Sequence, residues 1–491
     1  MRLPSDRPRP VALLVTGFWL MLGALMQLAA RAGGAGGHSS SSHSSSHGSS
    51  HSGGGSSHSG SGGSSGGFSS LCCILFFVAF IVILIVLGNR AKKSQGRAAV
   101  TPPVPPPDED SGKLAASLAA IPGFNLETFR QKVTDAFLKI QAAWSAQNLA
   151  EVRPFISDGI YQRFATQFRM MAQLKQRNVL SNIRILRIEP VAAARDGEYD
   201  VLQVYIAAAM NDAFVCELDP SLDSESDNAF VEYWSFIRKR QLASAEKDIY
   251  QNKGCPSCGA PLPPDMGELC RCGYCQVMVN SGEFDWVLAE ITQQDDYGRD
   301  SDMADSVAPE LPQAVADMTR DAPDLAVQLI EDKASNAFMQ IMTALATRNP
   351  SVVRRFVSDD ALAAITAMIP QQNIIFNRLY LNEAVLLDAT RENTRHALSV
   401  GLTATLQRVE IGDGSGFIPL DPEEVRAGYV MRLEREADAV PDKGALYQHQ
   451  CPNCGGAVGD TLDINCQYCG VPLNSPRNEW IVTGFHCEDA D

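Results

Sequence analysis

The residues best suited to chemistry in this sequence are eight of its 13 cysteines, which form two sets of four. Each set contains two Cys-x-x-Cys pairs: Cys255, Cys258, Cys272 and Cys275 in the first set, and Cys451, Cys454, Cys466 and Cys469 in the second. Two such pairs supply the four thiolates that a structural zinc ion needs for tetrahedral coordination. A redox-active Cys-x-x-Cys would not require two pairs in each module, so the spacing predicts two structural zinc ions per chain.

The remaining cysteines near these sets are less easily assigned. Cys270 precedes Cys272 by two residues and offers an alternative ligand, but the second set has no counterpart for it. The predicted ligand set therefore omits Cys270, and its substitution for another ligand stays open. Cys216 and Cys487 are expected to be small buried or terminal side chains.

The cysteine sets belong to a longer internal repeat. Residues 137–158 read FLKIQAAWSAQNLAEVRPFISD, and residues 338–359 read FMQIMTALATRNPSVVRRFVSD without a gap. Trp286, after the first set, returns as Trp480. A domain followed by a cysteine module thus occurs twice. The predicted boundaries are residues 123–248 and 329–440 for the domains, and residues 250–291 and 447–487 for the zinc ribbons.

Each domain that precedes a cysteine module is predicted to begin with helices and to end with strands. Apolar residues recur every three or four positions from Phe129 to Trp144, which predicts an amphipathic helix. Ser157 can cap a second helix. Strand-like runs follow at residues 183–188, 199–209 and 230–238. This order predicts an α+β fold with a curved sheet around a helix, and an acidic, solvated linker at residues 292–328 between the copies.

The first hundred residues have a different composition. Residues 1–32 combine early arginines, an apolar run and small residues, so they form either a cleaved signal peptide or a first membrane helix. Residues 33–67 are almost only Ser, Gly and His, which predicts a disordered tether, with metal chelation by histidine as the alternative. Residues 68–88 are uncharged, and at ~1.5 Å per residue they can cross the ~30 Å hydrocarbon layer as a transmembrane helix.

Basic residues set the expected orientation of this span. Arg90, Lys92, Lys93 and Arg97 follow it, whereas no Lys or Arg lies between Gly33 and Leu87. The positive-inside rule therefore predicts a protein of the cell (inner) membrane whose C-terminal bulk is cytoplasmic. Residues 89–122 form a basic, then Pro-rich and acidic stalk.

Charge and composition exclude several classes of protein. Hydrophobic residues at 45% exclude a wholly disordered chain. The first 97 residues carry a formal charge of +7 and the whole chain −16, so the remainder carries −23 and would repel phosphate backbones. We therefore expect no nucleic-acid partner. Only His396, His449 and His486 lie outside the tether, and neither a phosphate-binding loop nor an H-E-x-x-H motif occurs, so no catalytic residues are predicted.

The strand predicted at Val231–Arg238 (VEYWSFIR), after two helices and two strands, resembles the Tim44-like domain of the mitochondrial import-motor anchor subunit and its bacterial relatives. A bacterial subgroup is similar throughout, from the leader and tether to the four-cysteine ribbon. The second copy is weaker, because Tyr429–Leu433 (YVMRL) lacks the Trp and the Phe. The resemblance implies cystatin-like or nuclear-transport-factor-two-like cone domains, membrane-associated scaffolding, protein transport and lipid binding. It implies no catalytic residues.

These observations predict a membrane-anchored, non-catalytic scaffold or binding protein. Its expected partners are membrane lipid and a protein or unfolded polypeptide. The alternative from another class is a membrane-tethered enzyme of the cone fold, an isomerase or a hydrolase. In the first copy, four side chains are expected either to form an apolar wall for an extended ligand or to pack in the core: Val204, Ile206, Trp234 and Phe236.

Overall fold

The computed structural model describes residues 111–240, 247–298, 301–412 and 416–439, together with residues 451–488 except 452, 455, 457–462 and 478. It also describes two short strands, β1 (Ala30–Arg31) and β2 (Gly34–Ala35). The predicted transmembrane span and nearly all of the leader and tether lie outside the described residues. Among the described helices, none combines the length and apolar character needed to cross a bilayer.

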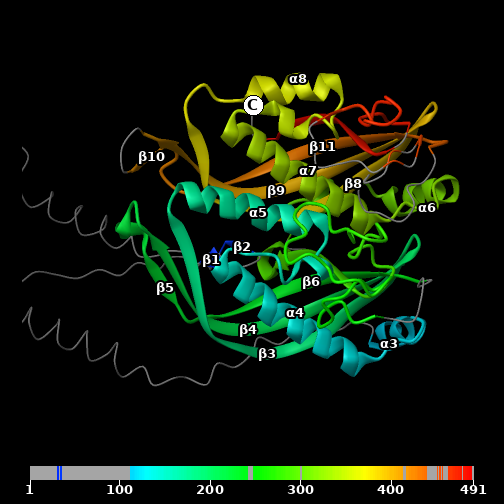
Figure 1. The fold of residues 1–491 in the computed structure, drawn as a ribbon, viewed down its shortest axis with the longest axis horizontal. Helices are drawn as coiled ribbons and strands as arrows, with labels where there is room; N and C mark the ends of the chain where they lie inside the picture. Colours follow the sequence, from blue (N-terminus) through cyan, green and yellow to red (C-terminus); the bar gives the residue numbers. More distant parts are fainter. Residues whose placement is uncertain are drawn as a thin grey trace, which may run out of the picture. The chain divides into compact units, whose positions relative to one another are not determined.

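The first half, residues 111–298, begins with helices and ends with an antiparallel sheet (Figure 1). Its helices are α3 (Ser111–Ala119), α4 (Leu126–Ala146) and α5 (Asp158–Gln173). Its strands are β3 (Gln176–Asp196), β4 (Tyr199–Cys216), β5 (Ser224–Ser226), β6 (Ala229–Lys239) and β7 (Val287–Gln293). They follow the order β3-β4-β6-β7, with β5 paired to β4. Side-chain oxygens begin the two longer helices, because Asn125 accepts from the Thr128 amide and Ser157 from the Ile160 amide.

The second half, residues 301–488, repeats this arrangement. Its helices are α6 (Leu311–Asp321), α7 (Val327–Thr347) and α8 (Asp359–Met368). Its strands are β8 (Ile374–Glu392), β9 (Arg395–Ile411), β10 (Phe417–Pro419), β11 (Val425–Glu436) and β12 (Ile481–Cys487). The sheet order is β10-β9-β11-β12, and β8 also pairs with β9. The α+β class expected from the sequence is confirmed.

Each cysteine module is inserted into its sheet, whereas the sequence placed it after a complete domain. β7 follows the first module and pairs with β6, and β12 follows the second module and pairs with β11. The predicted ribbon boundaries, residues 250–291 and 447–487, include most of β7 and all of β12, whereas these strands complete the two sheets. The two ends of each module are consequently tied to neighbouring strands of one sheet.

The concave side of the first sheet is filled by aromatic and aliphatic side chains. Phe137 of α4 lies 5.5 Å from Trp234 between ring centroids, and Phe129 lies 5.6 Å from Phe236. Trp234 and Phe236, like Val204 and the Ile206 beside them, have exposed fractions of 0%. The expectation that these four side chains form a wall for a ligand is therefore wrong for this structure, because they form the core.

Most acidic side chains of the segment between the copies, such as Asp302 and Asp317, are exposed, but the segment also packs on the second half. Asp296 is buried, and its carboxylate lies 2.6 Å from the Arg426 guanidinium of β11. Farther along, the Ala308 amide donates to the Leu387 carbonyl of β8 at 2.8 Å. The segment thus contacts the second half at several residues, and the burial of Asp296 is tolerated because its ion pair with Arg426 compensates the charge.

Candidate functional site

The four sulfur atoms of the first cysteine set lie within 4.8 Å of one another. The separation is 3.6 Å between Cys255 and Cys275 and 3.8 Å between Cys258 and Cys272. A tetrahedral zinc site with Zn–S bonds of ~2.3 Å requires sulfur separations of about 3.8 Å. The geometry therefore fits a four-thiolate metal site, with one buried and one exposed cysteine from each pair.

The second cysteine set has the same geometry. Cys451 and Cys469 are 3.6 Å apart at sulfur, and Cys454 and Cys466 are 3.7 Å apart. The backbone turns also correspond, because the amides of Tyr274 and Tyr468 each donate to the sulfur two residues earlier at 3.4 Å. Both modules bring together all four predicted ligands, and each group could hold a metal ion.

Cys270 lies outside the four-sulfur group. Its buried thiol is 3.5 Å from the Arg153 carbonyl oxygen and 4.0 Å from the Met266 sulfur. Burial raises the pKa of Cys270 to about 12, which disfavours the thiolate that a metal would require. The Cys270 side chain thus packs the first cysteine module against the rest of the first half.

Arg153 anchors the first module, and this role was not recognised in the sequence. The buried guanidinium donates to the backbone oxygens of Gly267 at 2.8 Å and Glu268 at 2.7 Å, and it forms an ion pair with Asp158. Asn280, at the end of the module, donates to the same Asp158 carboxylate at 3.0 Å. The sequence did show that Arg153 recurs as Arg354 in the repeat, but this recurrence did not indicate which groups Arg153 binds.

The two halves meet along a seam in which α5 of the first half contacts α7 and β8 of the second half. Asp196, the last residue of β3, accepts the Val327 and Gln328 amides, each at 2.8 Å. These amides belong to the first turn of α7, whose own preceding residue, Ala326, has no capping side chain. The first half therefore supplies the N-terminal cap of a helix in the second half.

Asp332 of the second half makes the corresponding contact with a helix of the first half. Its carboxylate accepts from the Ser157 hydroxyl and, at 3.3 Å, from the Gly159 amide at the N-terminus of α5. Burial raises the pKa of Asp332 to about 7, against the hydrogen bonds and helix dipole that favour its anion. Backbone amides at the N-termini of α7 and α5 thus each donate a hydrogen bond to a carboxylate of the opposite half.

A second acidic residue, Glu331, lies beside this contact. Its carboxylate accepts from the Leu386 amide of β8 at 3.0 Å, and burial raises its pKa to about 8. The nearby Glu290 carboxylate is bound by both terminal nitrogens of Arg163, which also donates to Ser335 at 2.8 Å. Because Arg163 is already paired with Glu290, the charge of Glu331 is poorly compensated at this position.

Gly159→Ala is expected to destabilise the protein, although alanine normally favours a helix over glycine by about 1 kcal/mol. A Cβ atom at Gly159 would overlap the carboxylate and the backbone oxygen of Asp332. We expect the free energy of unfolding to fall by about 1–3 kcal/mol in denaturant titrations of the purified chain. Gly412→Ala is the control, because nothing lies within 4 Å of its added Cβ. A stabilised Gly159→Ala variant would contradict the described seam.

Comparison with known proteins gives one family. A model of the Tim44-like domain family matches residues 111–250, from α3 to the start of the first cysteine module. No curated protein matches the chain. Among solved structures, an NTF2-like protein involved in plasmid conjugation is 11% identical, over 60% of this chain and 92% of its own, with a TM-score of 0.15. A TM-score this low does not establish a shared fold. The resemblance found in the sequence is confirmed by the family match.

Proposed function

Because residues 111–250 match the Tim44-like domain family, we propose that the chain is a non-catalytic scaffold at the cytoplasmic face of the cell membrane. The family match carries this proposal, since Tim44-like domains are scaffold or binding domains. Each half is then a cystatin-like or nuclear-transport-factor-two-like cone, in which an antiparallel sheet wraps around α4 or α7. The packed core of the first half supports binding at its surface over catalysis inside a cone-fold enzyme.

The proposed scaffold presents two metal modules to its partners. Four thiolates in tetrahedral spacing favour zinc, which would fix each module's turns without taking part in a reaction. The second turn of each module carries an exposed tyrosine, with 74% of Tyr274 and 65% of Tyr468 accessible. Large exposed side chains on a rigid turn are suited to contact with another polypeptide. Membrane lipid is the other proposed partner, through the span at residues 68–88.

Photo-crosslinking in membranes tests this scaffold function. A photoreactive phenylalanine analogue at Tyr274 or Tyr468 is expected to form adducts with a polypeptide, because both side chains project from the modules. The same analogue at Tyr205, whose side chain is buried in the first half, is the control and should form none. Adducts with lipid alone, at both tyrosines, would contradict a polypeptide partner at the modules.

The proposed orientation gives a separate prediction. Protease added outside intact spheroplasts should leave residues 111–491 undigested, because the basic residues after the span hold this part in the cytoplasm. Immunoblotting with an antibody against the C-terminal half measures the result. Digestion before the spheroplasts are lysed would show the opposite orientation.

A further inference from the structure

Two helices, α4 in the first half and α8 in the second, each carry an exposed apolar face. The α4 face includes Leu138, which is 41% exposed, and the exposed Ala142. The α8 face includes Met368, which is 39% exposed, and three exposed alanines: Ala363, Ala364 and Ala367. Apolar side chains that gather on one exposed face are typical of surfaces that bind another protein.

The internal repeat relates both faces to the seam between the halves. α4 and α7 begin and end at equivalent residues of the repeat, and α5 and α8 begin at equivalent residues. Leu138 is therefore equivalent to Met339 of α7, and Ala367 to Thr166 of α5. In the seam, Met339 and Thr166 are buried, and the Thr166 hydroxyl donates to the Met339 carbonyl at 3.4 Å. The two exposed faces thus correspond to the two sides of the contact between α5 and α7.

The acidic contact of the seam is replaced by a compatible pair in the exposed faces. In the seam, the Asp332 carboxylate accepts from the Gly159 amide at the N-terminus of α5. The equivalent residues are Gln131 on α4 and Asp360 on α8, and both are exposed. A second acid in place of Gln131 would repel Asp360 across such a contact, whereas the neutral amide does not.

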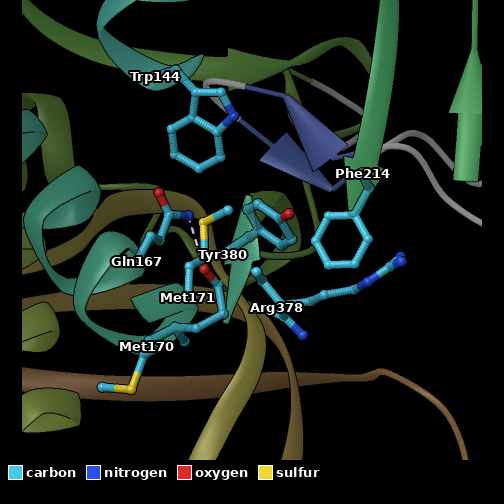
Figure 2. Close-up of a pocket in the computed structure, with 9 residues that line it drawn as sticks. Trp144, Gln167, Met170, Met171, Phe214, Arg378 and Tyr380 are labelled. Atoms are coloured by element: carbon cyan, nitrogen blue, oxygen red, sulfur yellow. Dashed lines mark hydrogen bonds between the residues drawn. The ribbon is translucent and has the colours of Figure 1, made fainter. Parts of the chain in front are cut away.

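In the seam, α5 also packs against an irregular part of β8. The register of β8 shifts between Asn377 and Tyr380, and Arg378 within the shift has a left-handed φ of 49°. Gln167 of α5 and Tyr380 line the same small pocket (Figure 2). The Gln167 amide donates to the Leu379 carbonyl at 2.8 Å. The register shift thus supplies a backbone acceptor for the helix that packs there.

β3, the strand that follows the helices of the first half, has the same register shift at an exposed position. Its register shifts between Ser181 and Arg184, and Asn182 within the shift has a left-handed φ of 51°. All three residues are exposed, and so is Met368, the equivalent of Gln167. The first half therefore has the surface that receives a helix, and the second half has the matching helix face.

We propose that copies of this chain associate head to tail, with the α8 face of one copy against the α4 face and the β3 register shift of the next. The chain already contains this contact once, between α5 and α7, so a second copy is the occupant whose surface has the matching elements. Because the interface joins two different surfaces, each copy in a pair keeps one face for a further copy. This association is independent of the partner proposed for the cysteine modules.

Photo-crosslinking of the full chain in membranes identifies what covers the α4 face. A photoreactive phenylalanine analogue at Leu138 is expected to form an adduct of twice the chain's mass, joined to a peptide that contains α8. The same analogue at Val425, which is 44% exposed and belongs to neither face, should give no adduct with α8. Adducts between two α4 helices, with another protein or with lipid, or no adduct at all, would overturn the proposal.

Charged substitutions test the head-to-tail arrangement. Leu138→Glu and Ala367→Lys should each weaken self-association of the purified chain about tenfold or more in sedimentation experiments, because each would bury a charge in an apolar contact. Both positions are exposed, so each variant should unfold at the same denaturant concentration as the parent. Val425→Glu is the control and should associate like the parent.

A mixture of the two variants gives the sharpest result. Equal amounts of Leu138→Glu and Ala367→Lys should form dimers, because the unchanged α8 face of the first variant fits the unchanged α4 face of the second. These dimers should not grow further, since the faces that remain both carry a substitution. A mixture that stays monomeric, or a single variant that associates like the parent, would show that the proposed interface is wrong.

Discussion

Removal of metal ions held by the four-cysteine groups is expected to unfold each cysteine module and to loosen the strand that follows it, β7 or β12. Among the described residues of the second module, the buried apolar cluster comprises Cys451, Cys466 and Leu473, with Val471 packed against it. So small a cluster cannot hold a fold, and structural zinc contributes about 10–16 kcal/mol in modules of this kind. Because β7 and β12 directly follow the modules, metal loss removes the constraint that positions the last strand of each sheet.

Metal analysis and hydrogen exchange measure this effect. We expect about two zinc ions per chain, and faster amide exchange in β7 and β12 after chelation. A Cys255→Ser/Cys451→Ser variant should lose both ions. Cys270→Ser is the matched control, since the Cys270 sulfur lies outside the four-sulfur group, and it should retain two. A double variant that folds normally, or a chain with less than about one zinc ion, would contradict the structural role.

The other large expected effect is a gain of stability in Glu331→Gln at pH 8. The folded-state pKa of Glu331 is about 8, raised by burial from the ordinary 4.5. The unfolded chain therefore ionises first, and this residue's contribution to stability, complete below about pH 4.5, is lost as the pH rises to about 8. The introduced amide would be neutral throughout and keeps an oxygen for the Leu386 amide, so we expect a gain on the order of a few kcal/mol at pH 8.

Denaturant titrations between pH 5 and pH 8 distinguish this effect from a general change in stability. The parent chain should lose stability relative to Glu331→Gln across this range, while Glu423→Gln, an exposed substitution, should follow the parent. Asp332 has a raised folded-state pKa of about 7, so Asp332→Asn should remove a similar pH dependence that ends near pH 7. Parallel pH profiles for the parent and Glu331→Gln would show that Glu331 is not buried at the seam.

Sequence patterns predicted those features of the structure that depend on residues close together in the chain. Ser157 was expected to begin a helix because its hydroxyl can satisfy a free amide, and it does so for Ile160. The metal groups were found because coordination chemistry fixes both the type and the spacing of the ligands. The resemblance to the Tim44-like family rested on the aromatic pattern of the strand that includes Trp234, which now lies in the core.

The seam could not be predicted in this way. Glu331 and Asp332 are ordinary residues for a helix surface, and only contacts with a distant helix and strand bury Asp332 and half-bury Glu331. Their counterparts in the repeat, Arg130 and Gln131, have different charges. α5 and α7 contact each other across the seam, whereas their counterparts α8 and α4 do not pair in this way, so the repeat by itself does not indicate the seam.

The contacts between the halves also affect how the chain emerges from the ribosome. Ser157 is synthesised 175 residues before its partner Asp332. During that interval, the face of α5 that includes Thr166 and Met170 lacks the second-half side chains that cover it, although both side chains are buried in the finished protein. The nascent first half is therefore an incomplete body with an exposed seam. We expect general chaperones to bind it until α7 has been translated, and messages truncated before that point to yield a product that is degraded.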